Sequence, residues 1–248
     1  MLSVIIITKN EEANLRRCLN SIQWVDEIIV FDSGSTDNTV AIAKEYTNNV
    51  FLTDWQGYGI QKQRALEQAT GTWVLNLDAD EAVSEALKKD IRLAIAENRA
   101  DAYRVPIHLN FYGKTLYYSC SPKRHIRLYK RHGARYTTSI VHEEIRVPSD
   151  AKIGQLKHAI QHHCFQDVSH ALSKMNLYSS YSAKIRIQNN YTPSFIKIVL
   201  GSWGMFFRCY FAQGGFLEGR DGFLFAVLSA QGSFYRNIKI LYRDKEKE

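Results

Sequence analysis

Three carboxylates follow an apolar run with no turn residue before them. The stretch Thr72–Glu81 runs from Thr-Trp-Val-Leu-Asn-Leu into Asp78, Asp80 and Glu81. Such a run is typical of a buried strand, and ligands of open α/β sheets bind outside the carboxyl ends of the strands. Two carboxylates one residue apart can share a hard cation, with water and phosphate oxygens completing its shell. The alternative is a solvated loop or a helix cap, in which an acid opens the helix expected over residues 84–98.

A second group of polar residues follows another apolar run. The segment Asp32–Asp37 joins an acid, a glycine and two hydroxyl residues that can cap a helix. Asp32 can accept a hydrogen bond from a ribose hydroxyl or a base N–H, or it can simply form a tight strand-to-helix turn. The chain lacks both the GxGxxG fingerprint and the GxxxxGK phosphate loop. A hydride-transfer enzyme and a P-loop nucleotidase are therefore disfavoured.

Alternating strands and helices must position these acids. The run Leu2–Thr8 is mainly apolar and rich in β-branched residues, as in a strand that is buried on both faces of a parallel sheet. The further strands expected are 27–31, 50–52 and one that ends at Asp78, and the expected helices are 13–22, 39–46 and 60–69. This alternation favours right-handed βαβ units around a parallel sheet.

Length, cysteine content and charge limit the classes of protein to which the chain can belong. The 248 residues suffice for one large α/β domain or one domain with an appendage, and the net charge is +7. The four cysteines form no CxxC, so we expect neither a disulfide framework nor a zinc site. A reduced, cytoplasmic setting fits this cysteine pattern best. A strand that begins at Leu2 leaves no room for a signal segment, so export is not expected. The positive charge predicts an anionic partner, but no nucleic-acid-binding signature accompanies it, so nucleic acid is not expected.

Three motifs in order resemble the nucleotide-sugar glycosyltransferases of family 2, which have a GT-A fold. Ser3–Glu12, Asp32–Asp37 and Asn76–Asp80 match that family's opening strand and loop, its nucleotide loop and its DxD motif. The resemblance implies an α/β fold with a Rossmann-like, mostly parallel sheet flanked by helices. It implies a catalytic domain over residues 1–170, in which 1–100 form the nucleotide-sugar half and 101–170 the acceptor half.

A narrower resemblance is to the lipopolysaccharide core beta-1,4-glucosyltransferases, cytoplasmic enzymes that add glucose to the first heptose of the inner core. It rests on Thr8–Glu12, Gly59–Arg64, Asp78–Glu81 and Val141–Glu143. The resemblance implies a UDP-sugar donor, with UDP-glucose preferred, and a lipopolysaccharide inner-core or other glycolipid acceptor.

The family resemblance also assigns residues to the donor. The residues that it places at the nucleotide pocket are Thr8, Asn10, Glu11 or Glu12, and Asp32, which would hold the uridine. Asp80 would be the main ligand of Mg²⁺ or Mn²⁺, and Asp78 would contact the ribose or the metal. Lys62 and Arg64 fall where the family places donor-contacting residues, although two cations on one helical face can also be a solvated surface.

The segment Ser139–Ile145 contains the candidate base. Inverting transfer requires one carboxylate to take the proton from the acceptor hydroxyl, while the metal stabilises the departing diphosphate. Glu143 lies in the family's His-Glu position and is the predicted base, whereas Glu144 would point to the opposite face of a strand. His142 is a predicted ligand of the metal or donor phosphate, with an ordinary hydrogen-bonded role as the alternative.

The middle of the chain changes character. Ala102–Tyr112 and Gly113–Tyr118 have the pattern of a hairpin. Lys123–Arg131 alternates between apolar and basic residues, so it is either a strand whose basic face meets phosphates or a solvent-facing edge strand protected by its charges. For His162 and His163, a structural role is favoured over a contact with pyrophosphate.

Residues 171–248 are expected to form a helical, amphipathic C-terminal extension. The apolar run Phe195–Phe207 is interrupted by Lys197 and closed by Arg208, so it falls short of the roughly 20 residues that span a bilayer. We therefore expect a peripheral anchor on the anionic, cytoplasmic face of the inner membrane. A helical hairpin packed on the catalytic domain is the alternative.

Together these patterns predict a metal-dependent, inverting glycosyltransferase that moves glucose from a UDP-sugar to a lipopolysaccharide inner-core heptose. One alternative is a family 2 enzyme that acts on another glycan or lipid carrier. The other is a non-catalytic sugar-nucleotide or glycan-binding module, which the presence of Asp78, Asp80 and Glu143 disfavours.

Overall fold

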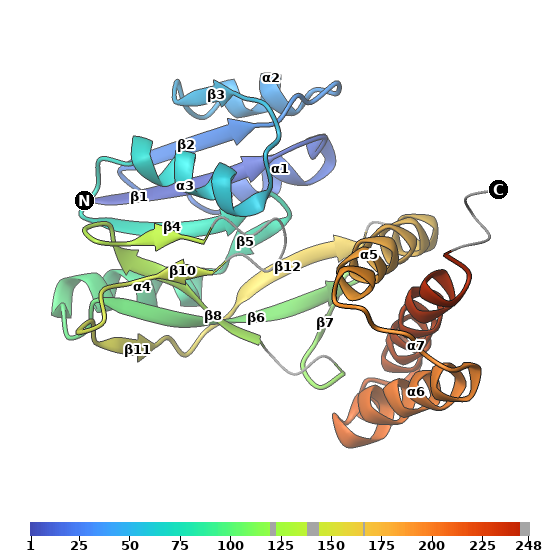
Figure 1. The fold of residues 1–248 in the computed structure, drawn as a ribbon. Helices are drawn as coiled ribbons and strands as arrows, with labels where there is room; N and C mark the ends of the chain where they lie inside the picture. The colour runs from blue at the N-terminus through green and yellow to red at the C-terminus, as the bar shows by residue number, and fades with distance from the viewer. Residues whose placement is uncertain (120–122, 138–143, 166, 244–248) are drawn as a thin grey trace. The chain divides into compact units, whose positions relative to one another are not determined.

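The computed structural model of the chain describes residues 1–119, 123–137, 144–165 and 167–243 (Figure 1). The chain forms two compact units. The first comprises Met1–His108 and Lys123–His163, and the second comprises Leu109–Pro122 and Cys164–Glu248.

The first unit begins with the predicted strand and helix alternation. Its parallel strands are β1 (Leu2–Thr8), β2 (Glu27–Asp32), β3 (Val50–Leu52) and β4 (Trp73–Asp78). Its connecting helices are α1 (Glu12–Asn20), α2 (Thr39–Lys44) and α3 (Tyr58–Gln68). The register pairs Thr8 with Asp32, and Ile7 with Asp78, so the strands end at the same edge of the sheet.

The same sheet continues with four further strands, which are β8 (Lys123–Lys130), β6 (Ala102–Phe111), β12 (Ile160–Phe165) and β5 (Glu81–Val83), in the overall order β3-β2-β1-β4-β8-β6-β12-β5. Strand β8 is antiparallel to both β4 and β6, and β5 is antiparallel to β12. The edge-strand interpretation of β8 is wrong, because β8 lies between β4 and β6. The three-residue strand β5 was not predicted, and it places Glu81 opposite His162.

Smaller elements complete this part of the chain. The predicted hairpin is confirmed, because β7 (Lys114–Leu116) pairs antiparallel with the end of β6. The others are β9 (Arg135–Tyr136), β10 (Ile145–Arg146), β11 (Ile153–Gln155) and α4 (Glu85–Glu97). Helix α4 begins where expected, since the Ser84 hydroxyl accepts a hydrogen bond from the backbone N–H of Leu87 at 3.2 Å.

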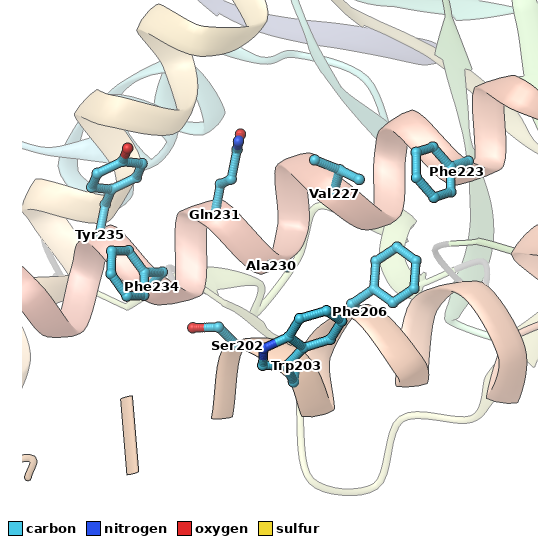
Figure 2. Close-up of a pocket in the computed structure, with 9 residues that line it drawn as sticks. All are labelled: Ser202, Trp203, Phe206, Phe223, Val227, Ala230, Gln231, Phe234 and Tyr235. Carbon is cyan, nitrogen blue, oxygen red and sulfur yellow. The ribbon is translucent and has the colours of Figure 1, made fainter. Parts of the chain in front are cut away.

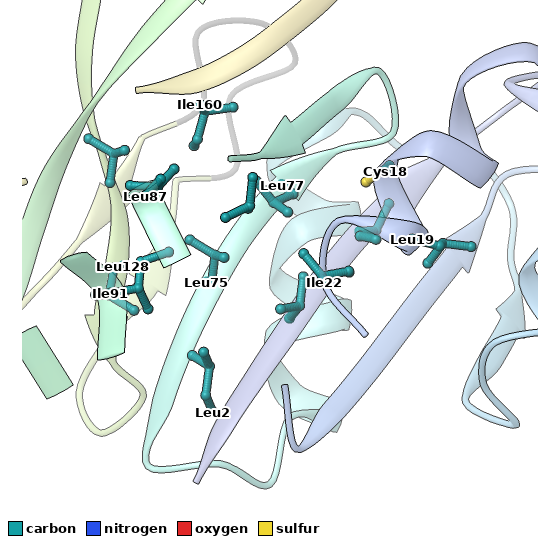
Figure 3. Packing of buried hydrophobic residues seen from close by; sticks show 14 of the residues in the cluster. Leu2, Cys18, Leu19, Ile22, Leu75, Leu77, Leu87, Ile91, Leu128 and Ile160 are labelled. Carbon is teal, nitrogen blue, oxygen red and sulfur yellow. The ribbon is translucent and has the colours of Figure 1, made fainter. Parts of the chain in front are cut away.

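The core of the first unit covers both faces of the sheet. Val4 and Ile6 of β1 belong to one cluster with side chains of α1 and α4. Figure 3 shows Leu19 of α1 and Leu87 of α4 within this cluster. Ile5 and Ile7 point to the other face, into a cluster with the side chains Ala65, Leu66, Val74 and Tyr129. All seven residues of β1 are buried, which explains why its sequence is mainly apolar.

The second unit is mainly helical. Its helices are α5 (Val168–Gln188), α6 (Phe195–Phe207) and α7 (Arg220–Leu241), with a π-helical turn at Arg208–Ala212 and a 3₁₀ turn at Gly215–Glu218. The helix expected after Asp167 is therefore confirmed. Its apolar stripe does not enter a core, however, because Leu172, Tyr178 and Tyr181 are exposed.

The apolar helix of this unit is longer than the sequence suggested. With the π-helical turn, the helical segment Phe195–Ala212 has 18 residues and a mean hydropathy of 1.2. Within the described part of the chain, it is the single helix that meets the length and composition required to cross a membrane. Only 11% of this segment is buried within the structure.

Candidate functional site

The loops that follow β1 and β2 are joined by hydrogen bonds. The side-chain oxygen of Asn10 accepts from the N–H of Thr36 at 2.8 Å, and the Glu12 carboxylate accepts from the N–H of Asn38 at 2.9 Å. Asn10 adopts a positive φ of 54°, a conformation that asparagine tolerates better than most residues. The backbone N–H of Glu11 donates to the Thr39 hydroxyl at 2.8 Å. Three of the predicted nucleotide-pocket residues therefore hold two loops in one fixed arrangement.

Asp32 shapes the turn at the end of β2. One carboxylate oxygen accepts from the N–H groups of Gly34 and Ser35, at 2.9 and 2.8 Å, and the other accepts from the Ser35 hydroxyl. The side chain is almost fully buried. The turn-forming role considered for Asp32 is thus present, and contact with uridine stays a prediction. Next to it, the Thr8 hydroxyl is buried and has no hydrogen-bond partner among the described residues.

The first acid of the DxD motif is held by two cations. Lys62 Nζ lies 3.0 Å from one oxygen of Asp78, and Arg127 Nη2 lies 3.0 Å from the other. The cations themselves are buried, since Lys62 is 5% and Arg127 is 7% exposed. Burial alone would raise the pKa of Asp78, but the charges of Arg127 and Lys62 hold it well below its ordinary value. Asp78 is therefore an ionised carboxylate with a fixed position.

Arg127 also binds Glu81. The same Nη2 atom lies 2.7 Å from Glu81 Oε1, and Glu81 Oε2 accepts the backbone N–H of Asp78 at 2.9 Å. Burial raises the pKa of Glu81 to about 7, against the opposing effect of the Arg127 charge. Because this carboxylate is 1% exposed and both its oxygens are bonded, it has no access to an acceptor hydroxyl. Glu81 thus has a structural role. Although its pKa is raised, its burial disfavours it as the general base that deprotonates the acceptor.

The second acid of the DxD motif faces a histidine. His162 Nε2 lies 3.2 Å from Asp80 Oδ2, because β12 pairs with β5 immediately after the motif. Burial disfavours a charged imidazole, yet the Asp80 carboxylate raises the pKa of His162 to about 9. The two DxD acids therefore have different surroundings, with fixed cations around Asp78 and a titratable imidazole beside Asp80.

A divalent cation at this site would take carboxylate or imidazole ligands from the protein. Among the residues that the structure describes, no group of three or more His, Cys, Asp or Glu side chains is arranged to hold a metal. Asp80 and His162 provide two adjacent donors. This set fits a Mg²⁺- or Mn²⁺-type ion that takes one or two protein ligands and completes its shell with water and substrate phosphates.

A cavity of about 440 Å³ opens beside Asp78. The residues that line it are Lys62, Asn76, Asp78, Arg104, His125, Ile126, Arg127, Tyr136, Glu144 and Ile145. Glu144 therefore lies at this cavity. His142 and Glu143, the predicted metal ligand and base, lie outside the described residues.

The two predicted donor-contacting cations of α3 diverge. Lys62 is buried against Asp78, whereas Arg64 lies on the surface, with its Nη1 atom 2.8 Å from Asp54 Oδ1. The alternative of two cations on one solvated face is wrong for Lys62, because residues two apart on an α-helix do not share a face. Lys62 lines the cavity beside Asp78, whereas Arg64 binds the loop that precedes its helix. Contact of either residue with the donor stays a prediction.

The sequence did not predict that Arg127 contacts Asp78 and Glu81, or that His162 contacts Asp80. The alternation of β8 showed that Arg127 faces away from Ile126 and Leu128, but not what it meets. For His162 the sequence favoured a structural role, and it did not indicate that the side chain meets Asp80. Both become part of the site through pairing with segments far away in the sequence.

The acidic residues and the loops of the site lie at the carboxyl ends of the parallel strands, where α/β enzymes bind their ligands. The sequence model of "Glycosyl transferase family 2" matches residues 3–149, which is more than half of the chain. The chain belongs to this family and has its GT-A fold, as the sequence predicted. It is a glycosyltransferase.

Two relatives extend the similarity over nearly the whole chain. The "Lipopolysaccharide core biosynthesis glycosyltransferase LpsC" of Rhizobium meliloti is 34% identical over 257 residues, which cover 98% of this chain and 92% of the relative. An "Uncharacterized glycosyltransferase" of Rickettsia bellii is 33% identical, covering 96% and 85%. The crystal structure of S. aureus TarS 1-349 superposes with a TM-score of 0.48 at 17% identity, covering 100% of this chain and 92% of that chain.

Proposed function

We propose that the chain is a metal-dependent, inverting transferase that moves glucose from UDP-glucose to a heptose of the lipopolysaccharide inner core. The observation that carries the proposal is the register of β1 with β2 and β4, which brings the ends of three parallel strands together at Thr8, Asp32 and Asp78. The relation to LpsC supports an acceptor of this class.

The nucleotide would bind at the joined loops after β1 and β2. Hydrogen bonds between the loops fix their backbone, so binding a nucleoside there costs little further ordering. The buried Thr8 hydroxyl and the remaining acceptor capacity of Asp32 suit a uracil or ribose, which offers both donors and acceptors. Lys62 adds a cation near the diphosphate.

Asp80 would hold Mg²⁺ or Mn²⁺, with His162 as the adjacent donor. When bound, such a cation stabilises the negative charge of a leaving diphosphate. The protein's own part is to present one ionised carboxylate and one imidazole side by side, 3.2 Å apart, at the end of the DxD strand. His142 is a further proposed ligand.

Glu143 is the proposed base, on the resemblance of Val141–Glu143 to the family's His-Glu position. Its neighbour Glu144 lines the cavity beside Asp78 and is the competing candidate. Whichever residue acts must take the proton from the acceptor hydroxyl as that hydroxyl attacks the anomeric carbon.

We further propose that the second unit lies on the anionic cytoplasmic face of the inner membrane. Ile196, Leu200 and Trp203 on α6 are 71, 65 and 59% exposed. The cations Lys197 and Arg208 lie within this apolar helical segment and near its end. An exposed apolar face with interspersed cations fits insertion among acidic lipid headgroups better than exposure to water.

Turnover with a defined acceptor would test the proposal. Radiolabelled UDP-glucose, UDP-galactose and UDP-N-acetylglucosamine should be offered with truncated lipopolysaccharide cores, with and without divalent metal. We expect metal-dependent transfer from UDP-glucose to a core that ends in heptose. Transfer only to a different glycan or lipid carrier would replace the acceptor, and UDP binding without any transfer or hydrolysis would favour a non-catalytic module.

A further inference from the structure

The interface between α5 and α7 in the second unit contains buried polar side chains. The two helices lie side by side (Figure 1), and Ser179 of α5 and Ser233 and Asn237 of α7 are buried. Lys239 of α7 donates to four oxygen atoms of α5, at distances of 2.7 to 2.9 Å. Its ammonium group therefore has acceptors for all of its N–H donors.

Two half-buried arginines at the same interface lack comparable acceptors. Arg236 Nη2 donates to the Ser233 hydroxyl at 3.1 Å, but its Nε is buried and has no hydrogen-bond partner among the described residues. Arg186 Nη1 of α5 lies 3.5 Å from Asn237 Oδ1, at the limit of a hydrogen bond, and its guanidinium lies 5.0 Å from the centre of the Tyr191 ring. In the described part of the chain, neither arginine pairs with a carboxylate.

The two guanidinium groups also repel each other. Burial and, after it, the charge of Arg186 lower the pKa of Arg236 below its ordinary value. Arginine stays protonated in proteins, so both positive charges persist. Like charges and an unpaired buried donor destabilise a fold. Packing of α5 against α7 therefore does not account for this pair of arginines.

The acids of the second unit are engaged elsewhere or lie outside the described residues. Asp167 caps the start of α5, Glu218 accepts the backbone N–H groups of residues 117–119, and Asp221 lies 3.5 Å from Lys114. The acids outside the described residues are Asp244, Glu246 and Glu248. An anion that offsets both arginines therefore comes from this C-terminal segment or from a ligand.

We propose that Arg186 and Arg236 bind a phosphate group at the interface of α5 and α7. Planar guanidinium donors match phosphate oxygens in pairs, and one phosphate has enough oxygens to accept from both arginines at once. The group belongs either to a lipid headgroup or to free phosphate. This site uses none of the residues assigned to sugar transfer, and the proposal does not depend on that reaction.

Titration with inorganic phosphate tests the site. Binding to the full-length protein would be measured by calorimetry at constant ionic strength, with UDP present so that phosphate does not report the cavity beside Asp78. Arg186→Gln and Arg236→Gln should each weaken phosphate binding by about tenfold, the effect of losing a charged hydrogen-bond donor. Lys184→Gln is the matched control, because it removes the same charge from an exposed position of α5, and it should change the affinity less than about twofold. Equal losses in all three variants would indicate diffuse attraction and overturn the site.

Stability distinguishes a binding role from a structural one. In phosphate-free buffer, Arg236→Gln should have a Tm equal to or above that of the wild type, since it relieves repulsion and removes a buried unpaired donor. Added phosphate should raise the Tm of the wild type and not that of the variant. A lower Tm of Arg236→Gln without phosphate would overturn the proposal. If this variant does not fold, Arg186→Gln is judged by the same two measurements.

Vesicles identify the source of the phosphate. Phosphatidylglycerol vesicles would be compared with vesicles of diacylglycerol succinate, an anionic lipid whose headgroup is a carboxylate, at equal surface charge. If Arg236→Gln weakens binding only to phosphatidylglycerol, the site takes a lipid headgroup, whereas an effect on inorganic phosphate alone assigns it to free phosphate. Insertion of α6 is followed separately through Ile196 and Leu200, so it can fail without affecting this result.

The C-terminal acids provide the last control. Neutralising Asp244, Glu246 and Glu248 together should leave phosphate binding unchanged or strengthen it by less than about threefold, since removal of negative charge favours an anion only modestly at an exposed position. If phosphate binds only after this change, the chain's own carboxylates are the partners of the arginines, and the proposal is overturned. Absence of phosphate binding in every variant would overturn it as well.

Discussion

The two units of the chain differ in where their charged and apolar side chains lie. In the first unit, four charged side chains at the strand ends pair with one another, three of them buried and Asp78 partly exposed, and the apolar side chains fill two clusters around the sheet. In the second unit, the large apolar side chains of α6 lie at the surface. In the first unit, the charged side chains thus pair and the apolar side chains pack within the unit. The second unit leaves an apolar surface exposed, and contact between such a surface and water is unfavourable.

The second unit contains an apolar groove, which differs from the charged cavity of the first unit. It has a volume of about 420 Å³, and Trp203 and Phe206 of α6 face Phe223, Val227 and Phe234 of α7 across it (Figure 2). By comparison, the cavity of the first unit is lined by Lys62, Asp78 and Arg127. One cavity suits a phosphorylated polar ligand and the other suits hydrocarbon, in keeping with the proposed transfer of a sugar from UDP-glucose to a lipid-borne acceptor with release of UDP.

The largest effect is expected in the first unit, at Asp80. Asp80→Asn should nearly abolish glucosyl transfer while the circular dichroism spectrum stays unchanged, because it removes a metal donor and no core contact. Removal of divalent metal by EDTA should have the same effect, and readdition of Mn²⁺ should restore the activity. Full transfer in EDTA would contradict the assignment.

The next effect concerns the base. Glu143→Gln should lower transfer by about a hundred- to ten-thousandfold, while the affinity for UDP-glucose changes little. Glu144→Gln is the matched control and should keep most of the activity. The reverse result would move the role to Glu144, the residue that lines the cavity beside Asp78.

A smaller effect is expected in the second unit, on membrane binding. Ile196→Glu/Leu200→Glu adds negative charge to side chains that are 71 and 65% exposed, so partition to anionic vesicles should fall at least about tenfold. High salt should weaken the wild-type binding. Leu93→Glu is the control, because Leu93 is 58% exposed but lies in α4 of the first unit. Equal loss for all variants would remove the proposed difference between the units.

The smallest effect is a pH dependence of stability from His162. Because its pKa is raised from 6.5 to about 9 in the folded, metal-free protein, protonation of His162 stabilises the fold. This contribution is complete below pH 6.5 and is lost as the pH rises to about 9. Urea unfolding of wild type and His162→Asn should therefore differ most at low pH and converge above pH 9. A constant difference across this range would mean that His162 has no charged partner in Asp80.

The sequence determined the parts of this protein that depend on neighbouring residues. The run Leu2–Thr8 specified a strand buried on both faces, since every residue in it except Ser3 is apolar or β-branched. The order of Asp32 and Asp78 after apolar runs placed both acids at strand ends, and Ser84 marked the start of α4. Local periodicity and capping suffice for such conclusions, because they involve contacts within a few residues.

Only the tertiary structure decided which of these residues meet. Arg127 reaches Asp78 and Glu81 because β8 lies inside the sheet, beside β4, and strand order depends on pairing between distant segments. His162 reaches Asp80 across 82 residues through a three-residue strand too short to give a sequence signal. The apolar stripe of α5 has helical spacing whether it is buried or exposed, so periodicity specified the helix but not what covers Leu172, Tyr178 and Tyr181.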